Sequence, residues 1–152
     1  MKNLSKLLLV FALGIWGYNT AKAQSALKAD KAEKATEVKN LVNNKDYVFE
    51  ATNAKGEKSL AYHKYNVAIS KDTLVANLPG NKSPLKISST DYAYDEWRSK
   101  AGYEIIIKPK AGVTSDVKQI RMEVTPQGHA SVRVNSGHGP LSLNGYIKQE
   151  DY

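Results

Sequence analysis

Apolar and polar residues alternate with a period of two over most of the chain beyond residue 46. This alternation is typical of β-strands that bury one face and expose the other. It predicts a mainly β fold of seven or eight short antiparallel strands, which would form a small sandwich or a small barrel. The apolar positions that define the strands are Tyr47, Phe49 and Ala51; Tyr65, Val67 and Ile69; Leu74, Ala76 and Leu78; Leu85 and Ile87; Tyr103, Ile105 and Ile107; Ile120, Met122 and Val124; Ala130, Val132 and Val134; and Leu141 to Ile147.

Two hairpins have a register that their apolar faces determine. Matching these faces pairs Ile69 with Leu74, because a slip by one residue would turn one apolar set to the wrong side of the sheet. The same rule sets Val124 against Ala130 and leaves residues 126–128 (PQG) as the loop. Proline at the start and glycine at the end suit a type I turn followed by a left-handed residue.

Two further strands carry specific expectations. Ile106 adds an apolar residue to the second face of strand 103–107, so we expect a central strand that is buried on both faces. The strand that begins at Leu85 is expected to continue through residue 94.

Residues 25–44 are rich in Ala, Lys and Glu, which favour a helix. The spacing of four apolar residues predicts this helix over residues 32–42, with Asn43 and Asn44 at its end. We expect the residues upstream to fray into a mobile tail. The helix would cover one side of the sheet, and the alternative is a partner-binding segment. Its apolar stripe consists of Ala35, Val38, Leu41 and Val42.

The first 23 residues follow a different pattern. Lys2 and Lys6 precede a run of ten mainly apolar residues, 7–16, and the sequence Ala-Lys-Ala follows at 21–23. A basic start, a short apolar middle and an A-x-A site are typical of a secretory signal peptide. The run is too short to span a membrane, which needs roughly 18 apolar residues. We therefore expect cleavage after Ala23 and a periplasmic or secreted protein.

Removal of residues 1–23 leaves 129 residues (152 − 23), which suits one domain with an N-terminal helical segment (24–44) and an antiparallel β domain (45–152). Loss of the three lysines in the removed segment lowers the formal net charge from +7 to +4. The remaining charges are spread along the chain, so nucleic acid is not an expected partner. The absence of cysteine excludes thiol catalysis, cysteine-ligated zinc and a lipid-modified N-terminal cysteine. We expect no stable membrane insertion after cleavage.

Candidate groups for chemistry are few. His63, His129 and His138 lack the close spacing of paired metal ligands, so neither a metal site nor a cofactor is predicted. Asp95 and Glu96 are adjacent, and adjacent residues of a strand point to opposite faces, so they are not expected to act together as a glycosidase pair. No catalytic residue is assigned.

The densest mixture of aromatic and charged residues lies near Asp95. Tyr92, Tyr94 and Trp97 are predicted to bind a ligand, together with the loop 79–84. Aromatic faces bind sugar rings or peptides without any catalytic geometry. The alternative is that these residues serve cross-strand packing.

Two segments resemble a known family. Residues 65–75 (YNVAISKDTLV), followed by Leu-Pro at 78–79, are similar to the central signature of the domain-of-unknown-function 4251 family of exported bacterial proteins. The sequence VRV at 132–134 and the sequence PLSLNG at 140–145 resemble its closing hairpin. The resemblance spans about residues 40–148 and implies the fold and the compartment, whereas the family has no assigned activity. This chain departs from the family pattern at 80–84 and 137–139.

We therefore expect an exported β domain, not an enzyme, that binds a small molecule, a glycan or an envelope protein. Two alternatives stay open. The first is a periplasmic hydrolase of a glycan or peptide that uses Asp95, Glu96 or His138. The second is an assembly protein in which strand 74–78 adds to the sheet of a partner.

The signal peptide generates a first prediction. Protein purified from the cells that export it should have the mass of residues 24–152, because the peptidase removes residues 1–23. Intact-protein mass spectrometry checks this mass, and native spectra of the same sample reveal any bound small molecule as additional mass that denaturation removes. A mass corresponding to all 152 residues would contradict the interpretation.

Overall fold

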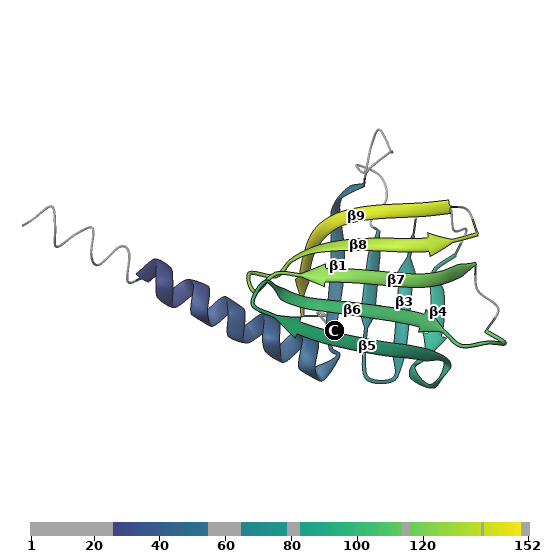
Figure 1. Cartoon of the computed structure of the whole chain (residues 1–152), viewed down its shortest axis with the longest axis horizontal. Coiled ribbons are helices and arrows are strands. Elements are labelled where there is room, and N and C mark those ends of the chain that lie inside the picture. Colours follow the sequence, from purple (N-terminus) through teal and green to yellow (C-terminus); the bar gives the residue numbers. More distant parts are fainter. Residues whose placement is uncertain (1–25, 55–64, 79–82, 114–115, 138, 150–152) are drawn as a thin grey trace, which may run out of the picture. The chain divides into compact units, whose positions relative to one another are not determined.

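The structure is a computed structural model that describes residues 26–54, 65–78, 83–113, 116–137 and 139–149. These residues form one N-terminal helix (26–44), nine strands and one short 3-10 turn (Figure 1). The strands are β1 (Tyr47–Ala54), β2 (Asn66–Ile69), β3 (Thr73–Asn77), β4 (Leu85–Ser88), β5 (Tyr92–Ser99), β6 (Gly102–Pro109), β7 (Val117–Val124), β8 (His129–Ser136) and β9 (Gly139–Lys148), and the 3-10 turn η1 spans Ser89–Asp91. The predicted fold class, a helix followed by antiparallel strands, is confirmed.

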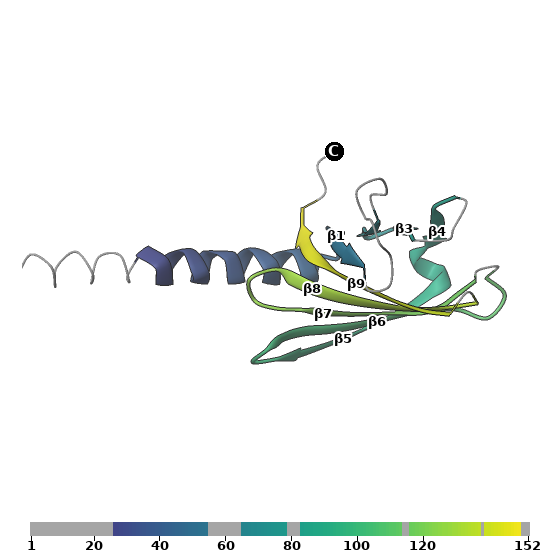
Figure 2. The same cartoon turned by 90° about the horizontal axis from the view of Figure 1, so that it is seen from above.

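All nine strands belong to one antiparallel sheet, in the order β4-β3-β2-β1-β9-β8-β7-β6-β5. The sheet curls into a nearly closed barrel, so the structure selects the barrel over the sandwich. Figure 2 shows β5 to β8 in one layer and β1, β3 and β4 in another, with β9 passing between them. The two ends of the sheet, β4 and β5, are consecutive in the chain and are joined by η1.

The strand expected to run from Leu85 to residue 94 is in fact two strands. The 3-10 turn Ser89–Asp91 interrupts it, and the two halves lie at opposite ends of the sheet. The turn is held by backbone bonds on both sides: Ser89 N donates to Asp72 O over 2.7 Å, and Lys110 N donates to Asp91 O over 2.8 Å. The structure therefore has nine strands where seven or eight were expected.

Both predicted registers are confirmed. Ile69 lies opposite Leu74, and Val124 lies opposite Ala130. In the second hairpin Thr125 N donates to His129 O over 2.8 Å, which leaves three loop residues, and Gly128 has φ +86° as the turn type requires. Strand β3 pairs with β2 on one side and β4 on the other, so the suggestion that strand 74–78 is a free edge is wrong.

The inner faces of the strands surround one apolar cluster. Its fully buried members include Phe49, Ile105 and Met122, and burial of each such side chain stabilises the fold by about 1.5–3 kcal/mol. Ile106 is only partly buried because it points to the outer face of β6. The expectation of a strand buried on both faces is therefore incorrect.

The helix is longer than predicted, since it begins by residue 26 and ends at residue 44. Of its expected stripe, Val38, Leu41 and Val42 are buried in the same cluster as the strands, whereas Ala35 is partly buried. Residues 35–44 form one compact unit with the sheet. Among the described residues, no helix is long and apolar enough to cross a membrane.

Gly145 marks a close approach between two strands. A Cβ built on Gly145 would overlap the carbonyl oxygen of Glu50 on the neighbouring strand β1. The clash involves backbone atoms, so no side-chain movement can relieve it. Glycine is therefore required at this position of the β1–β9 ladder.

This close approach generates a prediction. Replacement Gly145→Ala should lower the free energy of unfolding by about 1–3 kcal/mol or more, because overpacking forces the two strands apart. Urea denaturation followed by circular dichroism measures the change. The neighbouring Asn144→Ala is the matched control, since Asn144 is exposed on the other face and should change stability little. Equal effects of the two variants would contradict the assignment.

Candidate functional site

The three aromatic residues predicted to bind a ligand do not share one surface. Tyr92 and Tyr94 point inward from β5, where Tyr92 is buried and Tyr94 is half-buried. Trp97 points outward and is 51% exposed. The reason is parity: side chains alternate along a strand, so positions 92 and 94 share a face that position 97 cannot share. Of the three predicted aromatic residues, only Trp97 lies on the outer face and can contact a ligand there. The prediction that all three form one binding surface is therefore wrong.

The two inward tyrosines join the polar part of the core. The hydroxyl groups of Tyr94 and Tyr47 are 3.2 Å apart. Burial is the main cause that raises the pKa of Tyr47 well above its ordinary value, and burial also raises the pKa of Tyr94. Both hydroxyls therefore remain protonated in the folded protein. Burial raises the pKa of Tyr92 as well.

The end of the helix contacts Tyr94. Asp46 N donates to Leu41 O over 3.2 Å and Lys45 N donates to Val42 O over 3.0 Å, which is a Schellman motif. Lys45 occupies the left-handed position of this motif, with φ +51°, where glycine is usual. Its Nζ lies 4.4 Å from the centroid of the Tyr94 ring, so a cation–π contact accompanies the strained backbone. These contacts connect the helix to β5 and give Tyr94 a packing role.

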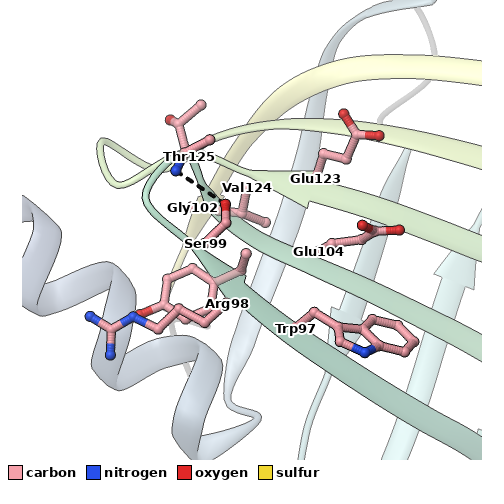
Figure 3. A pocket seen from close by; sticks show the side chains of 10 residues that line it. Trp97, Arg98, Ser99, Gly102, Glu104, Glu123, Val124 and Thr125 are labelled. Atoms are coloured by element: carbon pink, nitrogen blue, oxygen red, sulfur yellow. Dashed lines mark hydrogen bonds between the residues drawn. The ribbon is translucent and has the colours of Figure 1, made fainter.

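A pocket of about 370 Å³ lies at the end of the β5–β6 hairpin and beside the end of β7. The exposed indole of Trp97 is one of the side chains that line it (Figure 3). The residues that line it are Trp97, Arg98, Ser99, Ala101, Gly102, Tyr103, Glu104, Glu123, Val124 and Thr125. The described residues place their largest exposed aromatic side chain next to this pocket, which makes it the candidate site.

One row of side chains crosses the outer face at the pocket. Trp97 on β5 lies opposite Glu104 on β6, and Glu104 lies opposite Glu123 on β7. Figure 3 shows the three side chains one above another, with the indole ring seen nearly face-on. Neighbouring strands are about 4.8 Å apart. The row therefore places an aromatic face beside two carboxylates, over a distance that one or two sugar rings would cover.

Arg121 holds the two carboxylates in place. Its Nη2 is 2.9 Å from Glu104 Oε1, and its Nε is 3.6 Å from Glu123 Oε1. Arg121 and Arg133 lie directly opposite each other in the β7–β8 ladder, a like-charge pair that these two glutamates compensate. Two arginines against two carboxylates leave this patch of the outer face without a net charge.

The end of the β5–β6 hairpin also contributes lining residues to the pocket. The Arg98 guanidinium lies 5.7 Å from the centroid of the Tyr103 ring, and Ala101 N donates to Ser99 Oγ over 3.1 Å. Gly102 has φ +132°, and a Cβ there would overlap the Val124 carbonyl oxygen. A glycine is thus needed for β6 to approach β7 at the pocket.

Other predicted residues do not converge. Asp95 and Glu96 point to opposite faces of β5, and His129 is exposed at the start of β8. His63, His138 and residues 79–82 of the predicted loop lie outside the described residues, as does the signal peptide. Within the described part of the chain no three His, Asp or Glu side chains are grouped as metal ligands.

Glu104 and Glu123 were not identified from the sequence. A signal existed: the segment Ser99-Lys100-Ala101-Gly102 separates two alternating runs, and a two-residue turn at 100–101 pairs Ser99 with Gly102. That register sets Trp97 against Glu104. Combined with the predicted alternation of β7, it would have placed both glutamates on the face of the tryptophan.

Comparison with known proteins identifies relatives of this fold. The sequence model of the domain of unknown function DUF4251 matches residues 29–147. The crystal structure of a DUF4251 family protein from Bacteroides eggerthii DSM 20697 is similar, with a TM-score of 0.60 and 15% sequence identity over 80% of this chain and 91% of that chain. At this identity the likeness concerns the fold alone. No curated protein matches the chain.

The buried tyrosines generate a pH prediction. Above about pH 10 the unfolded chain releases tyrosine protons that Tyr47 and Tyr94 retain in the folded protein. The folded state then binds more protons than the unfolded state, so stability decreases as the pH rises. Urea denaturation across this range should show a smaller loss for Tyr47→Phe than for the unchanged protein. Tyr146→Phe, at an exposed position, is the control. An identical loss in all three proteins would contradict the burial argument.

Proposed function

The chain belongs to the DUF4251 family, and from that premise we propose that it is an exported binding module that holds a saccharide at the Trp97 pocket. The module would act outside the inner membrane, since residues 1–23 have the pattern of a signal peptide. The protein binds its ligand without transforming it.

The row of Trp97, Glu104 and Glu123 carries this proposal. A sugar ring has apolar C–H faces and hydroxyl groups around its edge. An exposed indole face suits the apolar face of the ring. A pyranose stacked on Trp97 has its hydroxyls at the distance of the next strand, where Glu104 accepts hydrogen bonds.

The charge of the row favours a neutral ligand. Arg121 and Arg133 balance the charges of Glu104 and Glu123, so this patch has no net charge that would attract an ionic ligand. The side chains of the two glutamates remain 38% and 51% exposed, which leaves carboxylate oxygens free to accept from hydroxyl groups. Oligosaccharides rich in hydroxyls and without acidic groups fit this arrangement best.

Binding fits the geometry better than hydrolysis does. Glycosidases place two carboxylates on either side of the scissile bond, with the substrate between them. Asp95 and Glu96 lie on opposite faces of β5, so no one bond can be flanked by them. Glu104 and Glu123 lie side by side on one face, and Arg121 occupies the space next to both. A ligand can lie over this row, but it cannot lie between its carboxylates.

Tryptophan fluorescence offers a direct test. The chain has two tryptophans, Trp16 and Trp97, and cleavage after Ala23 leaves Trp97 alone. Its emission in the cleaved protein therefore reports on the pocket. Neutral hexasaccharides of glucose, mannose and N-acetylglucosamine are the probes. We expect at least one of them to change the emission in a saturable way, with a dissociation constant no weaker than about 1 mM.

Variants identify the surface that binds. Calorimetry of Trp97→Ala should show binding weakened by about 30-fold, because a stacked tryptophan contributes roughly 2 kcal/mol. Glu104→Gln tests the neighbouring acceptor and should weaken binding less. Tyr146→Ala is the matched control, since Tyr146 is an aromatic of the same outer face and is 41% exposed.

Two results would count against the proposal. Absence of saturable binding for all three hexasaccharides would exclude saccharides as the ligand. Equal weakening of binding by Trp97→Ala and Tyr146→Ala would exclude the Trp97 pocket as the binding site. Mass spectrometry of the probes after incubation separates binding from hydrolysis. Cleaved products that disappear in Glu123→Gln would replace the binding function with hydrolysis at the pocket row.

A further inference from the structure

The free edge of β5 differs from the other end of the sheet. β5 closes the strand order with eight residues and pairs with β6 only. The opposite end, β4, has four residues and follows Pro84 directly. Short edge strands and proline are the usual protection against edge-to-edge pairing. β4 has this protection, whereas β5 is long enough to accept another strand.

The last five residues of β5, Asp95–Ser99, are all exposed. Exposure on both faces means that the core covers neither side of this segment. The middle residue is Trp97, 51% exposed. Within the described part of the chain Glu96 has no ion pair, and Arg98 has only its contact with the Tyr103 ring. The segment therefore presents an open backbone edge, a large aromatic side chain and two uncompensated charges.

This segment is complementary to itself. If two copies pair antiparallel about Trp97, Glu96 of each copy lies opposite Arg98 of the other, and Asp95 lies opposite Ser99. Directly opposite side chains have Cβ atoms about 4.5–5.5 Å apart, which suits two ion pairs. Trp97 of one copy then faces Trp97 of the other on the outer face.

Neighbouring registers lack this match. Pairing centred on Glu96 would oppose Glu96 to itself, and pairing centred on Arg98 would oppose Arg98 to itself, both of which place like charges together. Centres between residues would set the outer face of one copy against the inner face of the other. Only the register about Trp97 combines opposite charges with continuous faces over the whole exposed segment.

We propose that the protein forms a two-fold dimer in which the β5 edges of two copies pair antiparallel about Trp97. The two sheets then become one continuous sheet, and backbone hydrogen bonds with the two Glu96–Arg98 pairs hold the contact. The two Trp97 side chains lie side by side on the same outer face. This assembly does not depend on the saccharide proposal, because its backbone bonds and Glu96–Arg98 pairs come from the edge of β5, and Trp97 is the one residue of the pocket row that it shares.

Sedimentation equilibrium of the purified protein, without added saccharide, tests the dimer. A concentration-dependent mass that approaches twice the chain mass is expected below about 1 mM protein. Glu96→Arg and Arg98→Glu, each alone, should raise the dissociation constant about tenfold or more, since each turns two attractive pairs into two repulsive ones. A protein that stays monomeric at every concentration would overturn the proposal.

Mixing the two single variants gives the most specific result. In the mixed dimer each Glu96→Arg chain meets an Arg98→Glu chain, so opposite charges face each other again at both contacts. We expect the equimolar mixture to associate as the unchanged protein does, and the double variant Glu96→Arg/Arg98→Glu to do the same. Two repelling variants that fail to associate when mixed would overturn the register.

The matched control reverses a charge away from the edge. Lys108→Glu changes an exposed lysine on the outer face of β6 and should leave the dissociation constant unchanged. Circular dichroism confirms that each variant is folded. A dimer that tolerates Glu96→Arg and Arg98→Glu, or loses affinity equally with Lys108→Glu, would show that β5 is not the contact.

Discussion

The burial of inner-face side chains in a single apolar cluster determines the arrangement of the whole sheet. Each strand contributes alternate residues to this cluster, so a shift of one residue in any pairing would expose apolar groups and bury polar ones. The constraint fixes the hairpin registers, and these registers determine which side chains are neighbours on the outer face. Trp97, Glu104 and Glu123 stand in one row because residues of opposite parity on the same three strands fill the core.

Strand β5 is where this constraint ends. Its first half is tied to the core by Tyr92 and Tyr94, and the helix end supports it through Lys45. Its second half, Asp95–Ser99, extends beyond the core and is exposed on both faces. Both proposals concern this half, because residues that packing does not need are free to take part in binding. The saccharide proposal uses Trp97 on its outer face, and the dimer uses its open edge.

Alternation along single strands was enough to predict some residues of the site, whereas others depend on strand pairing. Trp97 was identified because it is an aromatic residue in a charged segment. Tyr92 and Tyr94 were grouped with it, although the parity rule that separates Asp95 from Glu96 also separates these tyrosines from Trp97. Glu104 and Glu123 were not identified, because their place beside Trp97 requires the pairing of β5 with β6 and of β6 with β7, and only pairing brings residues distant in the chain together.

The sequence by itself determined the helix stripe, the alternation of the strands, the registers of the β2–β3 and β7–β8 hairpins, and the family to which the chain belongs. These features are local, or they follow from matching two adjacent apolar faces. Only the tertiary structure decided that residues 85–94 split at Ser89–Asp91, that Ile106 faces outward, and that β5 is an edge strand. The physical reason is that closure of the sheet depends on contacts between strands far apart in sequence, which no local pattern records.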